Sequence, residues 1–296
     1  SDAGVFPHGL QARQFAYMVR FGMTPLQAIR SATSVAAEFI GWEKDVMNLN
    51  YASMRKIFAK YQDPESIVIA VVGDIKPQET LMLLEKYFGQ IPAGRENRDV
   101  ISAEPQPTEE RRVKVEFDAS PMMIIGYHKP NAPAFEDYVL DVLDTILTSG
   151  RTSRLFKKLV TDRQIAKSVT SVNGLPATRY PNLFTIFAQP RHPHTNSELE
   201  EMILQEIENI KTSSVTDEEL NKAKNIIKTD YIKNLDSNAE IASMLTYYEI
   251  LLGDYKYISE YPKIIDQVTA EDIMKTAKVY FSRTNRTIAV LKKKND

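Results

Sequence analysis

The sequence predicts an α+β protein, and three observations point to this class. Between Pro121 and Gln189 the residue pattern reads as strand, helix, short helix, strand and strand. Strand-like runs with alternating or apolar character also occur at 112–117 and 286–291. Several segments between them carry helical capping signals, such as Thr216 with a glutamate three residues later.

The segment after Pro121 gives the clearest element order. The apolar run Met122–Ile125 ends in Gly126, as a buried strand ends. From Phe135, apolar residues recur at helical spacing and form one face, whereas acidic residues form the other. The apolar positions are 138, 139, 142, 143, 146 and 147, and the acidic residues are Glu136, Asp137, Asp141 and Asp144.

A small polar turn at 149–153 follows this helix and leads into a second helix over 155–160. Two runs rich in strand-forming residues come next, at 167–172 and 183–188. These runs complete the order that the α+β prediction rests on.

The turn Ser149-Gly-Arg-Thr-Ser-Arg-Leu-Phe156 resembles a motif of the pitrilysin/insulinase-type metallopeptidases, a family that includes the mitochondrial processing peptidases. In that family a Gly-rich Ser-Ser-Arg-Leu turn follows a Leu-rich helix in the second of two homologous domains. The resemblance implies a processing-peptidase-like domain with a mixed or antiparallel sheet covered by helices. It also implies that zinc belongs to the first domain only.

An internal repeat supports two homologous domains. A shift of 219 positions superimposes residues 49–72 on 268–291, with Lys56 on Lys275 and Tyr61 on Tyr280. Thr269 stands at a helix N-cap position, with Asp272 three residues later.

The two copies have unequal lengths. Residues 45–94 are expected to be the closing part of a truncated first domain, with a helix over 51–61, a strand at 66–72 and a helix from Pro77. Residues 95–110 are rich in proline and charge and are expected to be a linker. Residues 111–296 give room for a complete second domain.

Residues 1–44 are expected to form a helical fragment with a different origin. Ser1-Asp-Ala-Gly-Val-Phe-Pro-His-Gly9, Gly22-Met-Thr-Pro25 and Ala28-Ile-Arg-Ser-Ala-Thr33 resemble the end of the barrel in imidazolonepropionase-like amidohydrolases. The resemblance places Asp2 at that family's metal-contacting aspartate, but one carboxylate does not hold a catalytic metal. A fusion, a rearranged gene and a mis-joined sequence are all compatible with this junction.

Composition limits the classes of partner. The net charge of −2 gives no electrostatic reason to expect nucleic acid, and no apolar run reaches the length of a membrane span. The absence of cysteine excludes disulfides and thiolate metal sites. The chain begins without Met, which suggests a processed, excised or partial chain, and a soluble protein of the cytoplasm or periplasm is expected.

No catalytic residue, metal ligand or cofactor is predicted for this chain. The parent family binds zinc through His-x-x-Glu-His and a distant Glu, and that motif is absent here. His192-Pro-His194 has a spacing that can chelate on a strand, but its prolines favour a surface loop. The two remaining histidines are His8 and His128.

The resemblance also implies an Arg and a Tyr that bind substrate opposite the zinc. The adjacent pair Arg179-Tyr180 is the candidate, and Asn173 is a weaker one. Arginine can bind a peptide carbonyl or carboxylate, and tyrosine can donate a hydrogen bond. Stabilisation of a loop is the alternative role for both.

The leading functional prediction is a zinc-lacking, substrate-binding half of a pitrilysin-like metallopeptidase, not active alone. Its expected partners are a peptide or protein substrate and a zinc-bearing homologous subunit, or a second copy of the chain. A structural subunit like the core proteins of respiratory complexes is one alternative. An amidohydrolase fragment is the other.

Overall fold

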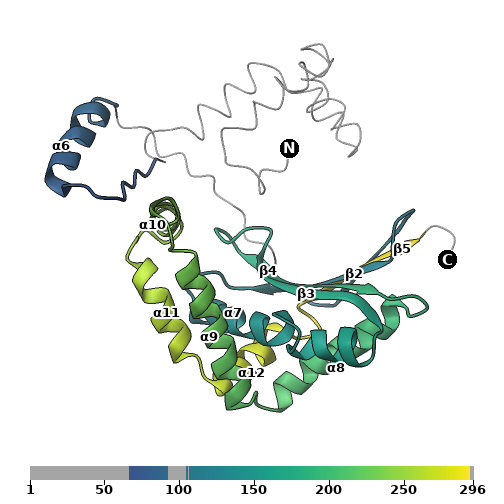
Figure 1. The fold of residues 1–296 in the computed structure, drawn as a ribbon. Coiled ribbons are helices and arrows are strands. Elements are labelled where there is room, and N and C mark those ends of the chain that lie inside the picture. The colour runs from purple at the N-terminus through teal and green to yellow at the C-terminus, as the bar shows by residue number, and fades with distance from the viewer. Residues whose placement is uncertain (1–66, 93–104, 106, 294–296) are drawn as a thin grey trace, which may run out of the picture. The chain divides into compact units, whose positions relative to one another are not determined.

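The structure, a computed structural model, describes residues 67–92, 105 and 107–293 (Figure 1). The predicted helix over 51–61, the amidohydrolase-like segment 1–44 and most of the linker 95–110 lie outside the described residues.

The first part, residues 67–92, contains one helix, α6 (Pro77–Phe88). Its start at Pro77 is as predicted, since proline suits the first helical turn. The strand predicted at 66–72 is wrong for its described residues, because residues 67–72 have no regular secondary structure. A β-strand needs a hydrogen-bonded neighbour, and no strand pairs with this run among the described residues.

The second part is built on a five-stranded mixed sheet in the order β1-β5-β2-β4-β3. Neighbouring strands are antiparallel except β1 and β5, which are parallel. The first and last strands of this part are therefore neighbours at one edge. The strands are β1 (Arg111–Phe117), β2 (Met122–Lys129), β3 (Ala166–Leu175), β4 (Asn182–Pro190) and β5 (Arg286–Lys293).

Helices cover one face of this sheet (Figure 1). They are α7 (Phe135–Thr148), α8 (Asn196–Thr212), α9 (Asp217–Lys233), α10 (Asn238–Leu252), α11 (Tyr257–Gln267) and α12 (Ala270–Tyr280). The short helix predicted over 155–160 is present as a π-helical segment, Phe156–Asp162.

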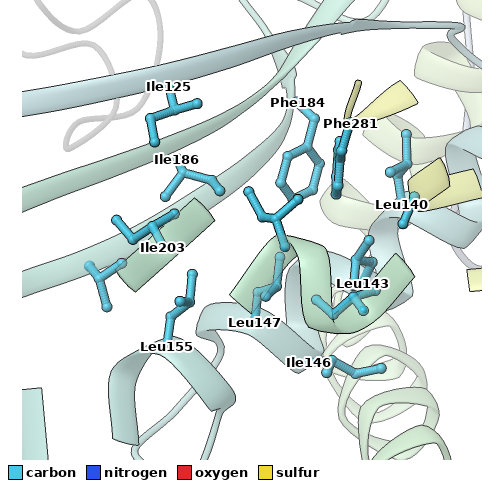
Figure 2. Packing of buried hydrophobic residues seen from close by; sticks show 14 of the residues in the cluster. Ile125, Leu140, Leu143, Ile146, Leu147, Leu155, Phe184, Ile186, Ile203 and Phe281 are labelled. Atoms are coloured by element: carbon cyan, nitrogen blue, oxygen red, sulfur yellow. The ribbon is translucent and has the colours of Figure 1, made fainter. Parts of the chain in front are cut away.

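The core lies between the sheet and these helices. Figure 2 shows Ile125 and Ile186, which are paired on adjacent strands, facing the α7 side chains Leu143 and Leu147. All four side chains are fully buried. The apolar face predicted for 138–147 is thus the face of α7 that packs on the sheet.

The capping signals in the sequence are confirmed. Thr216 with Glu219 forms a capping box at the start of α9, and Thr269 with Asp272 forms one at the start of α12. In each box the threonine side chain accepts the backbone N–H three residues later, and the acidic side chain accepts the threonine N–H.

The predicted α+β fold class is confirmed, and one strand is longer than predicted. Strand β2 continues past Gly126 to Lys129, because Tyr127 is fully buried and the strand pairs on both sides there. Among the described residues, none of the helices combines the length and the apolar character that a membrane span requires.

Candidate functional site

Arg179 and Tyr180 lie in the loop between β3 and β4, residues 176–181, which we call the Arg-Tyr loop. Two contacts fix this loop. The side-chain amide of Asn131 donates to the carbonyl oxygens of Thr178 and Arg179, each at 3.2 Å. The hydroxyl of Thr178 lies 2.9 Å from the hydroxyl of Tyr247 on α10. The backbone of the loop is thus held while its side chains stay accessible.

Both predicted binding residues are exposed. The Tyr180 side chain is 43% exposed, and the Arg179 guanidinium lies 5.8 Å from the centre of the Tyr180 ring. At this distance a cation and a ring attract each other weakly. Arg179 keeps its hydrogen-bond donors available to a peptide carbonyl or carboxylate, and the Tyr180 hydroxyl is a further donor.

Asn173 lies at the end of β3 and is directed to α7. Its amide nitrogen donates to the Asp137 carbonyl oxygen at 3.0 Å and to Asp141 Oδ1 at 2.8 Å. These bonds tie the strand that leads into the Arg-Tyr loop to the helix beneath it. Asn173 is thus engaged within the domain, and its role toward a substrate stays a prediction.

The acidic face of α7 is not a solvated face. Asp137 is buried and pairs with the buried Lys129 of β2. Asp141 accepts a hydrogen bond from the Tyr261 hydroxyl at 2.9 Å. Burial raises the pKa of Asp141 to about 6 and that of Asp144 to about 7. These carboxylates form a polar layer between α7, β3 and α11.

The sequence places these aspartates on one helical face, and the pattern alone predicts no function for them. The available signal was the spacing of Asp137, Asp141 and Asp144 on the helix together with Lys129 just before it. A lysine in a strand of buried residues needs a carboxylate partner.

The sequence predicts that none of the four histidines binds a metal. His192 and His194 lie in the loop between β4 and α8, as predicted, and His194 Nδ1 is 3.4 Å from Glu198 Oε1. His128 lies in β2. In the described part of the chain no three His, Asp or Glu side chains are grouped as metal ligands. Asp2 and His8 lie outside the described residues.

The turn motif at 149–156 has a structural role. Arg154 makes two hydrogen bonds to Glu219, from Nε at 2.7 Å and from Nη2 at 2.8 Å, and contacts Glu206 at 3.4 Å. Lys158 also pairs with Glu206 at 3.0 Å. The motif therefore binds α8 and α9 to the end of α7, and it contributes no group to the Arg-Tyr loop.

The chain is similar in sequence to bacterial proteins described as zinc proteases. The chain is 26% identical over 258 residues to the zinc protease PqqE of Helicobacter pylori, covering 86% of this chain and 57% of that protein. It is 24% identical to the uncharacterized zinc protease YmxG of Bacillus subtilis, covering 84% of this chain and 59% of that protein. The chain thus spans somewhat more than half the length of the curated relatives it matches.

Solved structures give the same fold. The crystal structure of a protease from Helicobacter pylori superimposes with a TM-score of 0.76 at 25% identity, over 84% of this chain and 61% of that one. A peptidase M16 inactive domain from Pseudomonas fluorescens superimposes with a TM-score of 0.72 at 17% identity, over 84% and 58%.

The comparisons give no support to the amidohydrolase resemblance of the N-terminal segment. They support the pitrilysin/insulinase-type resemblance. A protein-family model described as "Peptidase M16 inactive domain" matches residues 48–227, more than half of the chain, and the chain therefore belongs to this family.

Proposed function

We propose that this chain is the substrate-binding half of a two-part M16 peptidase and that it requires a zinc-bearing half for hydrolysis. The zinc would be held by a His-x-x-Glu-His motif on a homologous subunit or on another part of the same protein. Membership of the inactive-domain family supports a non-catalytic role. The relatives' description as zinc proteases supports a peptide as substrate.

The observation that carries the proposal is the exposed pair Arg179 and Tyr180 on a loop whose backbone accepts two hydrogen bonds from Asn131. Exposed donors on a fixed backbone lose little conformational freedom when they bind. An extended peptide offers carbonyl oxygens along its whole length, so it suits these donors.

Peptide binding tests the role of the pair. A fluorescein-labelled, unstructured peptide is titrated with wild-type chain and with Arg179→Ala, and binding is followed by fluorescence anisotropy. Affinity should fall about tenfold or more, because a hydrogen bond to a charged group contributes roughly 1.5–3 kcal/mol. Arg163→Ala, which changes an exposed arginine just after the π-helical segment, is the matched control and should bind as wild type.

The partner is tested separately. A subunit that carries His-x-x-Glu-His is mixed with the chain, and cleavage of the same peptide is measured with and without Arg179→Ala. Stimulated cleavage that is lost in the variant supports the proposal. If Arg179→Ala and Tyr180→Phe leave both binding and cleavage unchanged, the pair is not the site and a structural role becomes the better account.

A further inference from the structure

A second candidate binding site lies at the opposite end of the sheet. A cavity of about 1140 Å³ opens where β4 ends and α8 begins. The cavity and the Arg-Tyr loop lie at opposite ends of β4. This strand has nine residues, and at the rise of a β-strand the two sites are roughly 26 Å apart. The lining of the cavity comes from β1, β3, β4 and β5, the turn before β2, the loop with His192 and His194, and the start of α8.

The cavity is basic although the chain is not. The whole chain has 37 Lys and Arg against 39 Asp and Glu. Among the lining side chains, cations outnumber carboxylates five to two. The cations are Arg112, Lys114, Lys167, Lys292 and Lys293, and the carboxylates are Asp118 and Glu200. Positive charge is thus concentrated here.

Three of these cations are available for a ligand. Arg112 is already bonded to Glu200 at 2.6 Å and to Glu110 at 2.5 Å, and Lys114 lies 3.4 Å from Glu116. Lys167, Lys292 and Lys293 make no ion pair within the described residues, and all three are exposed. They come from two strands, β3 and β5, on either side of the cavity.

The start of α8 adds to this positive potential. Thr195, Asn196 and Ser197 line the cavity at the N-terminus of a helix of 17 residues. The capping box satisfies the N–H of Glu198, and the first-turn N–H groups carry the positive end of the helix dipole. The N-terminus of α8 and the three lysines therefore both favour a negatively charged ligand.

The apolar part of the lining indicates a peptide rather than a bare ion. Ile288 and Pro190 are buried, and Pro121 and Val290 are half-buried beside them. Such a floor accommodates methylene groups, and the volume is that of a ligand of many atoms. We infer that this cavity binds an acidic polypeptide segment, whose carboxylates pair with Lys167, Lys292 and Lys293 while its aliphatic portions contact the floor.

The test uses the full chain and a fluorescein-labelled peptide of alternating glutamate and alanine, followed by anisotropy at physiological ionic strength. The double variant Lys292→Glu/Lys293→Glu should bind at least about tenfold more weakly. Lys167→Glu, on the other strand, should also weaken binding. The matched control is Lys157→Glu/Lys278→Glu, which makes the same change in net charge at exposed lysines outside the cavity and should bind like wild type.

Several results would overturn the inference. If the control variant also bound the glutamate peptide more weakly, to the same degree, the effect would come from the net charge of the chain and not from this cavity. If wild type bound a peptide of alternating lysine and alanine equally well, the cavity would have no preference for negative charge. No binding of the glutamate peptide to wild type would remove the site. Displacement of the peptide by an equal concentration of inorganic phosphate would assign the cavity to a small anion. None of these measurements involves Arg179 or a zinc-bearing partner, so they stand apart from the peptidase proposal.

Discussion

At the scale of single residues, Arg154 has a testable effect on stability. It joins the turn after α7 to Glu219 on α9 and Glu206 on α8, and its side chain is 20% exposed. Arg154→Ala removes these bonds and leaves the partly buried Glu219 without an ion-pair partner, whereas Glu206 keeps its pair with Lys158. The free energy of unfolding should fall by about 1–3 kcal/mol, less than for a fully buried pair because Glu219 is partly exposed. Urea denaturation measures this change.

Arg151→Ala is the control for that experiment. Arg151 lies in the same turn, is exposed, and forms no ion pair within the described residues. Its removal should change the free energy of unfolding by no more than about 0.5 kcal/mol. Equal losses for the two variants would contradict a specific role of Arg154.

The same pair gives a pH dependence. Arg154 lowers the pKa of Glu219 from 4.5 to about 2. A folded-state pKa below the unfolded value stabilises the protein at higher pH, and this stability is lost as the pH falls from 4.5 toward 2. In Arg154→Ala the loss over this window should be smaller. Parallel curves of unfolding free energy against pH for wild type and variant would disprove the assignment.

At the scale of an element, α7 differs from an ordinary amphipathic helix because both of its faces are covered. Burial raises the pKa of Asp144 from 3.8 to about 7 and that of Asp141 to about 6. The folded state therefore binds more protons than the unfolded state between these values, so stability falls as the pH rises from about 4 to about 7.

Asp144→Asn tests this behaviour. The variant should be more stable than wild type at about pH 8 by at least about 1 kcal/mol, since each unit of pKa difference corresponds to about 1.4 kcal/mol. Its stability should also depend less on pH between 4 and 7, with Asp141 responsible for the remainder. Urea denaturation at both ends of the range measures this, and an unchanged slope would contradict the raised pKa.

The Arg-Tyr loop is a second element with a testable property. Asn131→Ala removes two hydrogen bonds to the loop backbone. Amide exchange at residues 177–180 should become about 2- to 10-fold faster, because one hydrogen bond contributes roughly 0.5–1.5 kcal/mol. Asn196→Ala, which removes a similar bond to the Leu291 carbonyl oxygen, should leave exchange in this loop unchanged.

At the scale of the whole molecule, the family assignment predicts how much zinc the chain holds. After dialysis against micromolar zinc, purified chain should contain close to no zinc by elemental analysis. His192 and His194 have no third ligand grouped with them among the described residues. About one zinc per chain, lost in His194→Ala, would show that the loop before α8 is a metal site.

The sequence predicted the second part of the chain well where burial controls the pattern. Strands β3 and β4 and helix α7 follow from apolar spacing, since these side chains form the core. The strand predicted at 66–72 is wrong for residues 67–72, because β structure depends on a neighbour that an apolar run does not reveal. The basic cavity was equally hidden, since Lys167 and Lys292 are brought together only by the order of the strands.

The parallel pairing of β1 with β5 has a consequence for how the domain forms during synthesis. Strand β1 emerges early, but its neighbour in the sheet, β5, is made only after every helix of this part. Until Arg286 and the residues after it leave the ribosome, β1 has no neighbour in this sheet, and contacts between distant segments are slow to form. A nascent chain stopped before β5 would therefore display an unprotected edge, which is the kind of surface that chaperones and proteases recognise.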